Sequence, residues 1–280
     1  MTKTLRQMQE NMKLIDLVIE IVDARIPVSG RNPDFDRLCA GKARMVLLGK
    51  SDLADPEETA KWMAYFRNRG FYPYTCDMRN NGALKGLTPA IMEACRAKIE
   101  RDRKKGITGR PVRAMVCGIP NVGKSTFINS FSGSASLKTG NKPGVTRGRQ
   151  WIRMNSKVEL LDTPGLLWPK FENQETGRKI ALLGSIPDEN VDQAELAYYL
   201  TDILKERRAG AFFERYSVTE DMTAEEIMEA VGKRRGALKK GGGTDLLKAS
   251  SLLLDEFRQG KLGRITLEPC PSEPLTEEGE

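Results

Sequence analysis

Histidine is absent from this 280-residue sequence, and its absence removes several mechanisms at once. The chain cannot supply a Ser-His-Asp triad, a histidine-ligated zinc site or a histidine that changes charge near neutral pH. Cysteine is scarce and scattered, with an odd number of residues and no C-x-x-C pair, which argues against a disulfide framework or a cysteine zinc site. The five are Cys39, Cys76, Cys95, Cys117 and Cys270. This usage is typical of a reducing compartment, so we expect a cytoplasmic protein.

Long apolar runs are also missing. Residues 14–22 are rich in apolar side chains, but Asp16 and Glu20 interrupt them, and about eighteen apolar residues are needed to cross a bilayer. The amino terminus lacks the apolar stretch of a signal peptide. We therefore expect a protein that does not associate with membranes.

Charge is abundant and unevenly placed. Forty-five Lys and Arg residues against 38 Asp and Glu residues give a net charge of +7. Five uncompensated acids lie in residues 268–280, so the rest of the chain carries +12. Three basic clusters, at residues 96–113, 138–157 and 233–240, are of the kind that attracts polyanions. One cluster alone is equally well explained as a solvated surface, whereas three favour a nucleic acid over an anionic membrane.

Apolar and β-branched segments predict six strands before about residue 173 and none after it. They lie at residues 16–22, 44–48, 71–76, 112–117, 150–154 and 158–161. Helical patterns between them, such as 56–70 and 84–103, predict an α/β fold whose mainly parallel sheet has helices on both faces. The later patterns, at residues 192–208, 223–235 and 244–257, are helical. We therefore predict an α/β domain over residues 1–173, a small all-α domain over 174–268 and a disordered acidic tail over 269–280.

The strongest motif is a phosphate-binding loop. Residues 118–125 read GIPNVGKS and match G-x-x-x-x-G-K-[ST], after a predicted strand and before a predicted helix. Backbone N–H groups of such a loop surround the β-phosphate, while Lys124 bridges the β- and γ-phosphates and the Ser125 hydroxyl coordinates Mg²⁺. The expected nucleotide contacts in and after this loop are Asn121, Val122, Gly123, Lys124, Ser125 and Thr126.

Two later elements complete the predicted phosphate site. The strand at residues 158–161 runs into Asp162-Thr163-Pro164-Gly165, where Asp162 can hold Mg²⁺ and the Gly165 N–H can approach the γ-phosphate. Between the loop and this strand, Thr146 follows a Pro-Gly pair and can ligate Mg²⁺ when the γ-phosphate is present, which makes its segment a switch.

Base recognition is expected earlier in the chain. Gly49-Lys50-Ser51-Asp52 resembles the Asn-Lys-x-Asp element of GTPases, in which the carboxylate accepts two hydrogen bonds from guanine and the lysine stem lies along the base. Gly49 departs from the expected asparagine, which favours weaker affinity rather than a different base. Cys76 and Asp77 are placed to bring a backbone N–H near guanine O6, although a plain turn explains them equally well.

The order of these elements is circularly permuted, because base recognition precedes the phosphate loop. With that order, Asp23-Ala24-Arg25-Ile26-Pro27, residues 118–125 and residues 162–170 (DTPGLLWPK) resemble the bacterial ribosome biogenesis GTPase A (YlqF) family over residues 1–268. The resemblance implies a permuted P-loop GTPase domain followed by a helical domain that touches rRNA. It implies a monomer that binds GTP or GDP with Mg²⁺, binds the large (50S) ribosomal subunit in its GTP state late in assembly, and leaves after hydrolysis.

The residue that activates water is not evident. Leu166 succeeds Gly165 where many GTPases have glutamine, and Met1-Thr2-Lys3 resembles the residues directly after a histidine-containing segment of the family. We expect Lys124, Thr146 and Gly165 to surround the γ-phosphate, with slow hydrolysis stimulated by the subunit and by K⁺ at Asn121, whose amide can equally well stabilise the loop. Arg25, before a proline at a strand end, is expected to be structural. The alternatives are a nucleotide-gated switch on a non-ribosomal RNA and, because of Gly49, an ATPase.

Overall fold

A computed structural model describes residues 9–79, 81–132, 151–163, 167 and 173–271. The chain forms two compact units. The first comprises Met1–Asp52, Pro56–Pro169 and Glu268–Glu280, and the second comprises Leu53–Asp55 and Lys170–Leu267. Thr146, Gly165 and residues 272–280 of the expected acidic tail lie outside the described residues. Among the described residues, the helices are too short or too polar to cross a bilayer.

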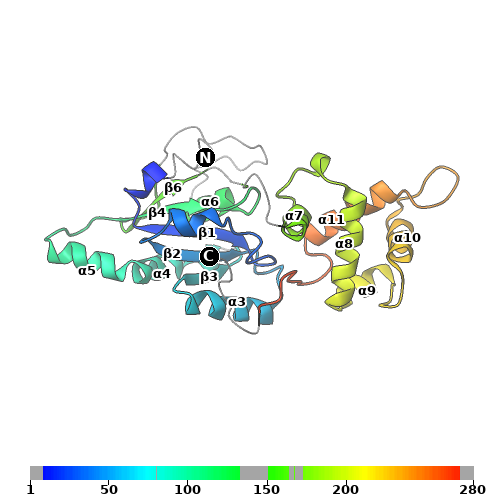
Figure 1. Cartoon of the computed structure of the whole chain (residues 1–280), viewed down its shortest axis with the longest axis horizontal. Coiled ribbons are helices and arrows are strands. Elements are labelled where there is room, and N and C mark those ends of the chain that lie inside the picture. Colours follow the sequence, from blue (N-terminus) through cyan, green and yellow to red (C-terminus); the bar gives the residue numbers. More distant parts are fainter. Residues whose placement is uncertain (1–8, 80, 133–150, 164–166, 168–172, 272–280) are drawn as a thin grey trace. The chain divides into compact units, whose positions relative to one another are not determined.

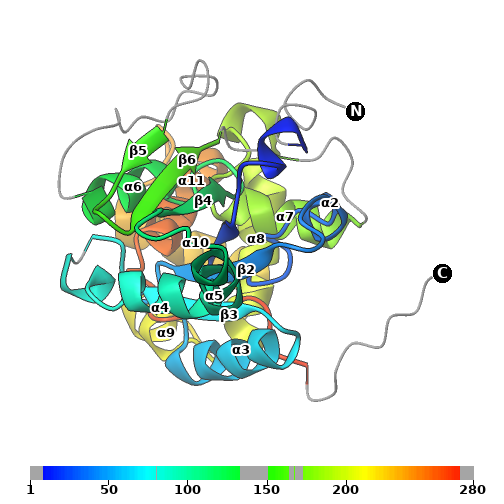
Figure 2. The same ribbon diagram turned by 90° about the vertical axis from the view of Figure 1, so that its left-hand side faces the viewer.

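The first unit is built on a six-stranded sheet in the order β3-β2-β1-β4-β6-β5. Only the pair β5–β6 is antiparallel. Figures 1 and 2 show helices on both faces of this sheet. All six predicted strands and the mainly parallel α/β fold are confirmed. The strands are β1 (Leu17–Asp23), β2 (Ala43–Gly49), β3 (Tyr72–Cys76), β4 (Val112–Cys117), β5 (Trp151–Arg153) and β6 (Val158–Asp162).

Strand β1 is buried along its whole length although it contains two acids. A buried carboxylate is costly unless it is paired, and both of these are paired. Glu20 Oε2 accepts from Arg31 Nε at 3.0 Å. Asp23 accepts from Arg25 through both of its oxygens at 2.9 Å. Arg25 is itself 1% exposed, so it has the structural role that was expected.

The predicted helix at residues 84–103 is wrong in one respect, because it is interrupted. It is replaced by a 3-10 turn η1 (Asn81–Leu84), α4 (Leu87–Ala94) and α5 (Arg96–Lys104), with a break at Cys95. Helix α4 buries Leu87, Ile91 and Ala94, whereas α5 buries no residue. The packed face ends at Cys95, and the polar residues after it have no core contact to keep them in line. The other helices of this unit are α2 (Asp34–Leu38), α3 (Pro56–Asn68) and α6 (Lys124–Ser132).

The second unit is helical in its described part, apart from one isolated bridge between Leu238 and Thr244. Thr223 and Glu226 form the reciprocal capping hydrogen bonds that their spacing predicts. Two short helices were not predicted, α7 and α9, because only the end of α7 is buried and α9 has seven residues. The helices are α7 (Gln174–Leu182), η2 (Asp188–Asn190), α8 (Gln193–Glu206), α9 (Gly210–Tyr216), α10 (Ala224–Arg235) and α11 (Leu246–Arg258).

The chain enters the second unit for three residues directly after Asp52. The Leu53 carbonyl accepts from Ile265 N at 3.0 Å, and the Ala54 carbonyl accepts from Arg264 Nε at 3.0 Å. Asp55 N donates to Thr266 Oγ1 at 3.1 Å. The segment directly after the predicted base-recognition carboxylate is therefore held by residues 264–266 of the second unit.

Candidate functional site

The predicted binding elements come after the carboxyl ends of neighbouring parallel strands. Residues 50–52 follow β2, residues 76–77 end and follow β3, and residues 118–125 follow β4. Strands β1, β2 and β3 are in register at their ends, with Asp23 beside Gly49 and Gly49 beside Cys76. The carboxyl edge of a parallel sheet is where α/β proteins bind ligands. The structure thus brings together elements that are up to 70 residues apart in the sequence.

The phosphate loop has the backbone that its glycines predict. Gly118 has φ +152°, and a Cβ there would lie 2.5 Å from the Ile21 carbonyl oxygen, so only glycine fits. Lys124 begins α6, and its ammonium donates to the carbonyls of Gly118 at 3.0 Å and Ile119 at 2.9 Å. The lysine is therefore folded back over its own loop, with its charge held where phosphate oxygens are expected to bind. Ser125 and Thr126 lie in the first turn of α6, next to the free N–H groups of a helix N-terminus.

Lys50 connects the base-recognition element to the phosphate loop. Its ammonium lies 3.4 Å from the Asn121 carbonyl oxygen and 3.1 Å from Asp23 Oδ2. Lys50 and Asn121 both adopt left-handed backbone conformations, with φ +54° and +58°. Burial opposes ionisation of Asp23, but the charges of Arg25 and Lys50 hold its pKa well below the usual range. Asp23 therefore stays ionised and fixes Lys50 beside the loop.

Asp52 has one paired oxygen and one unpaired oxygen. Its Oδ2 pairs with Arg79 Nη2, and Arg79 also bonds Asp77 Oδ1 through its backbone N–H and its Nε. Burial opposes ionisation of Asp77, but the hydrogen bonds from Arg79 lower its pKa. Asp52 Oδ1 is buried without a hydrogen-bond partner in the described part of the chain. An orphaned buried carboxylate oxygen needs a donor, and guanine N1 and N2 would supply one. This donor set fits a guanine nucleotide.

Sequence reasoning missed two residues of this site, Met78 and Arg79. Met78 follows Cys76 and Asp77 and is 4% exposed. A Cβ built at Gly49 would lie 2.2 Å from Met78 Cε, so Met78 occupies the space of the side chain that Gly49 lacks. The pattern of residues 76–79 carries no motif, and only the folded chain brings these side chains to residues 49 and 52.

The predicted magnesium ligands are described in part. Ser125 lies at the start of α6, and the backbone of Asp162 ends β6 beside Val116 of β4. Thr163 is buried, and its hydroxyl donates to the Val116 carbonyl at 2.7 Å, which anchors the strand end next to the phosphate loop. Thr146 and Gly165 are not among the described residues. The roles of these residues toward Mg²⁺ and the γ-phosphate stay predictions.

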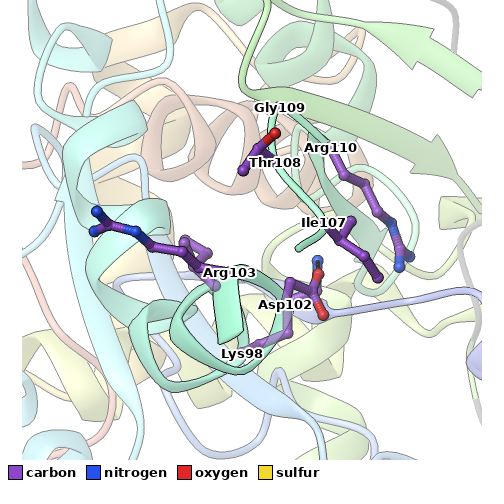
Figure 3. Close-up of a pocket in the computed structure, with 8 residues that line it drawn as sticks. Lys98, Asp102, Arg103, Ile107, Thr108, Gly109 and Arg110 are labelled. Carbon is purple, nitrogen blue, oxygen red and sulfur yellow. Dashed lines mark ion pairs between the residues drawn. The ribbon is translucent and has the colours of Figure 1, made fainter. Parts of the chain in front are cut away.

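A separate cavity of about 180 Å³ lies at the end of α5 and the turn after it (Figure 3). Pockets that enclose small-molecule ligands are usually about 300–1,000 Å³. Its lining contains no residue predicted to bind nucleotide; it consists of Lys98, Ile99, Asp102, Arg103, Ile107, Thr108, Gly109 and Arg110. It is therefore not the nucleotide site.

Comparisons with known proteins agree with this geometry. A family model described as a 50S ribosome-binding GTPase matches residues 113–234, which begin in β4 and exclude residues 50–52, as the permuted order requires. The ribosome biogenesis GTPase A of Bacillus cereus is 42% identical over 271 residues, covering 96% of this chain and 91% of that protein.

Two solved structures match nearly the whole chain. A GDP-bound TM YlqF has a TM-score of 0.69 and 27% identity, covering 94% of this chain and 99% of that one. A GNP-bound YlqF from T. maritima has a TM-score of 0.65 and 28% identity, covering 96% and 99%. Both the sequence resemblance and the predicted GTPase activity are confirmed. With its base-recognition strands placed before a phosphate loop on one shared sheet edge, the chain belongs to the ribosome biogenesis GTPase A (YlqF) family of circularly permuted GTPases.

Proposed function

We propose that this GTPase binds the large ribosomal subunit in its GTP state, acts late in subunit maturation and leaves after hydrolysis. The observation that carries the proposal is the pairing of β4 with β6, which sets the phosphate loop beside the strand end at Asp162 and Thr163. The residues after this strand lead into the second unit at Lys170. Loss of a γ-phosphate held by this strand end would act on the segment joining the two units. The names of the relatives support the ribosomal partner.

The chemistry derives from the side chains at the sheet edge. Lys124 exchanges the carbonyls of Gly118 and Ile119 for oxygens of the β- and γ-phosphates, and its charge opposes the charge that develops during transfer. Mg²⁺, when bound, neutralises the phosphates, and Ser125, Thr146 and Asp162 would hold it. The Gly165 N–H would contact the γ-phosphate. Asp52 selects guanine, supported by Lys50 and by residues 76–77.

Stimulation of hydrolysis is a testable part of the proposal. The chain has no histidine, and Leu166 succeeds Gly165, so intrinsic turnover should be slow. Asn121 is exposed on the phosphate loop and could hold K⁺ beside the phosphates. We expect phosphate release to be faster in K⁺ than in Na⁺ and faster again with large subunits, because charge stabilisation supplied from outside raises such rates by about 10³–10⁵. Equal rates in Na⁺, in K⁺ and with subunits would contradict it.

Helix α5 supplies a candidate contact for rRNA. It buries no residue, and Figure 1 shows it continuing beyond the edge of the sheet. Near its end, Arg103, Lys104 and Lys105 have no ion-pair partner among the described residues, while Arg101 bonds only the Ala97 carbonyl of its own helix. Figure 3 shows the guanidinium of Arg103 extending away from the neighbouring cavity. Exposed, unneutralised cations on a protruding helix fit a phosphate backbone.

Sedimentation with purified large subunits tests this contact and the nucleotide dependence together. We expect tighter binding with a non-hydrolysable GTP analogue than with GDP. Replacing Arg101, Arg103, Lys104 and Lys105 by Gln should weaken binding and reduce the slope of log K against log salt by about 3, since each lost phosphate contact removes roughly 0.7–0.9. Basal GTP hydrolysis should be unchanged.

A matched control removes four exposed cations elsewhere on the first unit, at Lys13, Arg37, Arg67 and Lys85. This variant should keep the wild-type salt slope. Equal losses in both variants would show diffuse charge rather than a contact by α5. Binding that ignores the nucleotide, or that occurs equally with unrelated RNA, would favour a switch on a non-ribosomal RNA. We place the protein in the cytoplasm as a monomer, because all the described nucleotide-site elements come from one chain.

A further inference from the structure

Position 49 is where this chain departs from the base-recognition element of GTPases, and the structure shows what fills the space. Gly49 ends β2, three residues before Asp52, and its carbonyl accepts from Ala24 N at 2.8 Å. A Cβ at this position would lie 2.2 Å from Cε and 3.4 Å from Sδ of Met78. Any side chain at position 49 therefore competes with the end of the Met78 side chain for the same volume.

Met78 also contacts the phosphate loop. A Cβ at Gly123 would lie 3.2 Å from Met78 Sδ, so the thioether lies against the loop one residue before Lys124. Met78 is 4% exposed and follows the end of β3 at Cys76. One side chain thus lies between the end of the base-recognition strand and the loop that holds the phosphates.

We propose that Met78 is a positioning residue that replaces the missing side chain at position 49 and packs the base-recognition strand end against the phosphate loop. Methionine suits this role, because its flexible, polarizable side chain fills irregular gaps. An apolar contact then does what a side-chain amide at position 49 would do by hydrogen bonding. The inference rests on the nucleotide roles proposed for Asp52 and the phosphate loop, and it is independent of the ribosomal partner.

The geometry makes positions 49 and 78 one steric unit. Interiors are close-packed, so emptying the volume leaves the two elements less well placed, and filling it twice pushes them apart. Asp52 is three residues from Gly49, and Lys124 is next to Gly123. Small shifts at either glycine therefore move the groups that read the base and the phosphates.

A double-mutant cycle with Gly49→Asn and Met78→Ala tests the proposal through the sign of one effect. In the wild-type background, Gly49→Asn should weaken GTP binding, because Met78 must leave its place against Gly123. In the Met78→Ala background, the same substitution should strengthen GTP binding, because the asparagine enters vacated space. Met78→Ala alone should weaken binding about tenfold, which corresponds to about 1.4 kcal/mol. Affinities are measured by titration calorimetry with a non-hydrolysable GTP analogue.

A second readout separates positioning from general loss of structure. Inosine nucleotides lack the 2-amino group of guanine, so the ratio of GTP to ITP affinity reports how well Asp52 is placed. Met78→Ala should lower this ratio, and the double variant should restore it. Met45→Ala is the matched control: Met45 is 1% exposed and lies in the same strand, β2. It should lower the melting temperature without changing the affinity or the ratio.

The same sign for Gly49→Asn in both backgrounds would overturn the proposal, as would an unchanged ratio in Met78→Ala. If Met78→Ala does not fold, Met78→Val enters the same cycle, with the same reversal expected. The base assignment fails separately. Undiminished GTP binding by Asp52→Asn would reject the role of Asp52, while a sign reversal at position 49 would still show that residues 49 and 78 share one volume.

Discussion

Lys124→Ala lowers the affinity for GTP by about a hundredfold or more and removes measurable turnover, because truncating one partner of a desolvated charge pair costs about 2–5 kcal/mol. The ammonium of Lys124 already lies over the loop, 2.9–3.0 Å from two carbonyl oxygens. Phosphate oxygens only have to replace those carbonyls, so little reorganisation opposes binding. The charge is also needed during transfer, so turnover falls further than affinity. Titration calorimetry and phosphate release measure the two effects.

Lys42→Ala is the control for this variant. Lys42 Nζ also donates to a backbone carbonyl, that of Ile15, at 2.9 Å, and it lies in the same unit but outside the site. Its loss should change stability by about 1 kcal/mol, the net value of such a hydrogen bond, and leave GTP affinity unchanged. Equal GTP affinity in Lys124→Ala and Lys42→Ala would contradict the assignment of the phosphate loop.

Asp52→Asn lowers GTP affinity by about a hundredfold and favours xanthosine nucleotides, since each hydrogen bond to a charged group contributes about 1.5–3 kcal/mol. The carboxylate accepts from both N1 and N2 of guanine, whereas an amide presents its own donors to the 2-amino group. Xanthine carries an oxygen at that position and can accept from the asparagine. The buried, unpartnered Oδ1 of Asp52 is the atom whose acceptor role is lost. Competition between GTP, XTP and ATP on each variant measures the change.

Asp52→Asn also disturbs the ion pair with Arg79, and Arg79→Ala separates that effect. Arg79 is exposed, and it bridges Asp52 and Asp77. Its removal frees Asp52 Oδ2, so GTP affinity should stay the same or rise. A loss of affinity in Arg79→Ala as large as that in Asp52→Asn would show that the ion pair, rather than guanine recognition, accounts for the result.

The contiguous features were predictable from the sequence for a simple reason. The phosphate loop is eight consecutive residues whose glycines, lysine and serine each have a local role, and its flanking strand and helix are indicated by apolar spacing. The six strands were predictable because buried parallel strands are continuous apolar segments. Even Glu20 and Asp23 in β1 did not disturb the pattern, because arginines from neighbouring segments pair with them.

The features that depend on distant approach were not predictable. Gly49 and Met78 are 29 positions apart in the sequence, and nothing in either segment indicates that one fills the space left by the other. The pairing of Arg79 with Asp52 is of the same kind. Likewise, the three-residue excursion of Leu53–Asp55 into the second unit depends on hydrogen bonds to residues 264–266. The break at Cys95 depends on where the core beneath α4 ends.

Titration calorimetry of the wild-type protein with a non-hydrolysable GTP analogue, with and without Mg²⁺, tests most directly whether the sheet edge grips one guanine triphosphate. One molecule should bind per chain, more tightly with Mg²⁺, and excess GDP but not ADP should displace it. Failure to take up guanine nucleotide in the presence of Mg²⁺, or equal displacement by ADP, would contradict the assignment of residues 50–52 and 118–125 to a single GTP site.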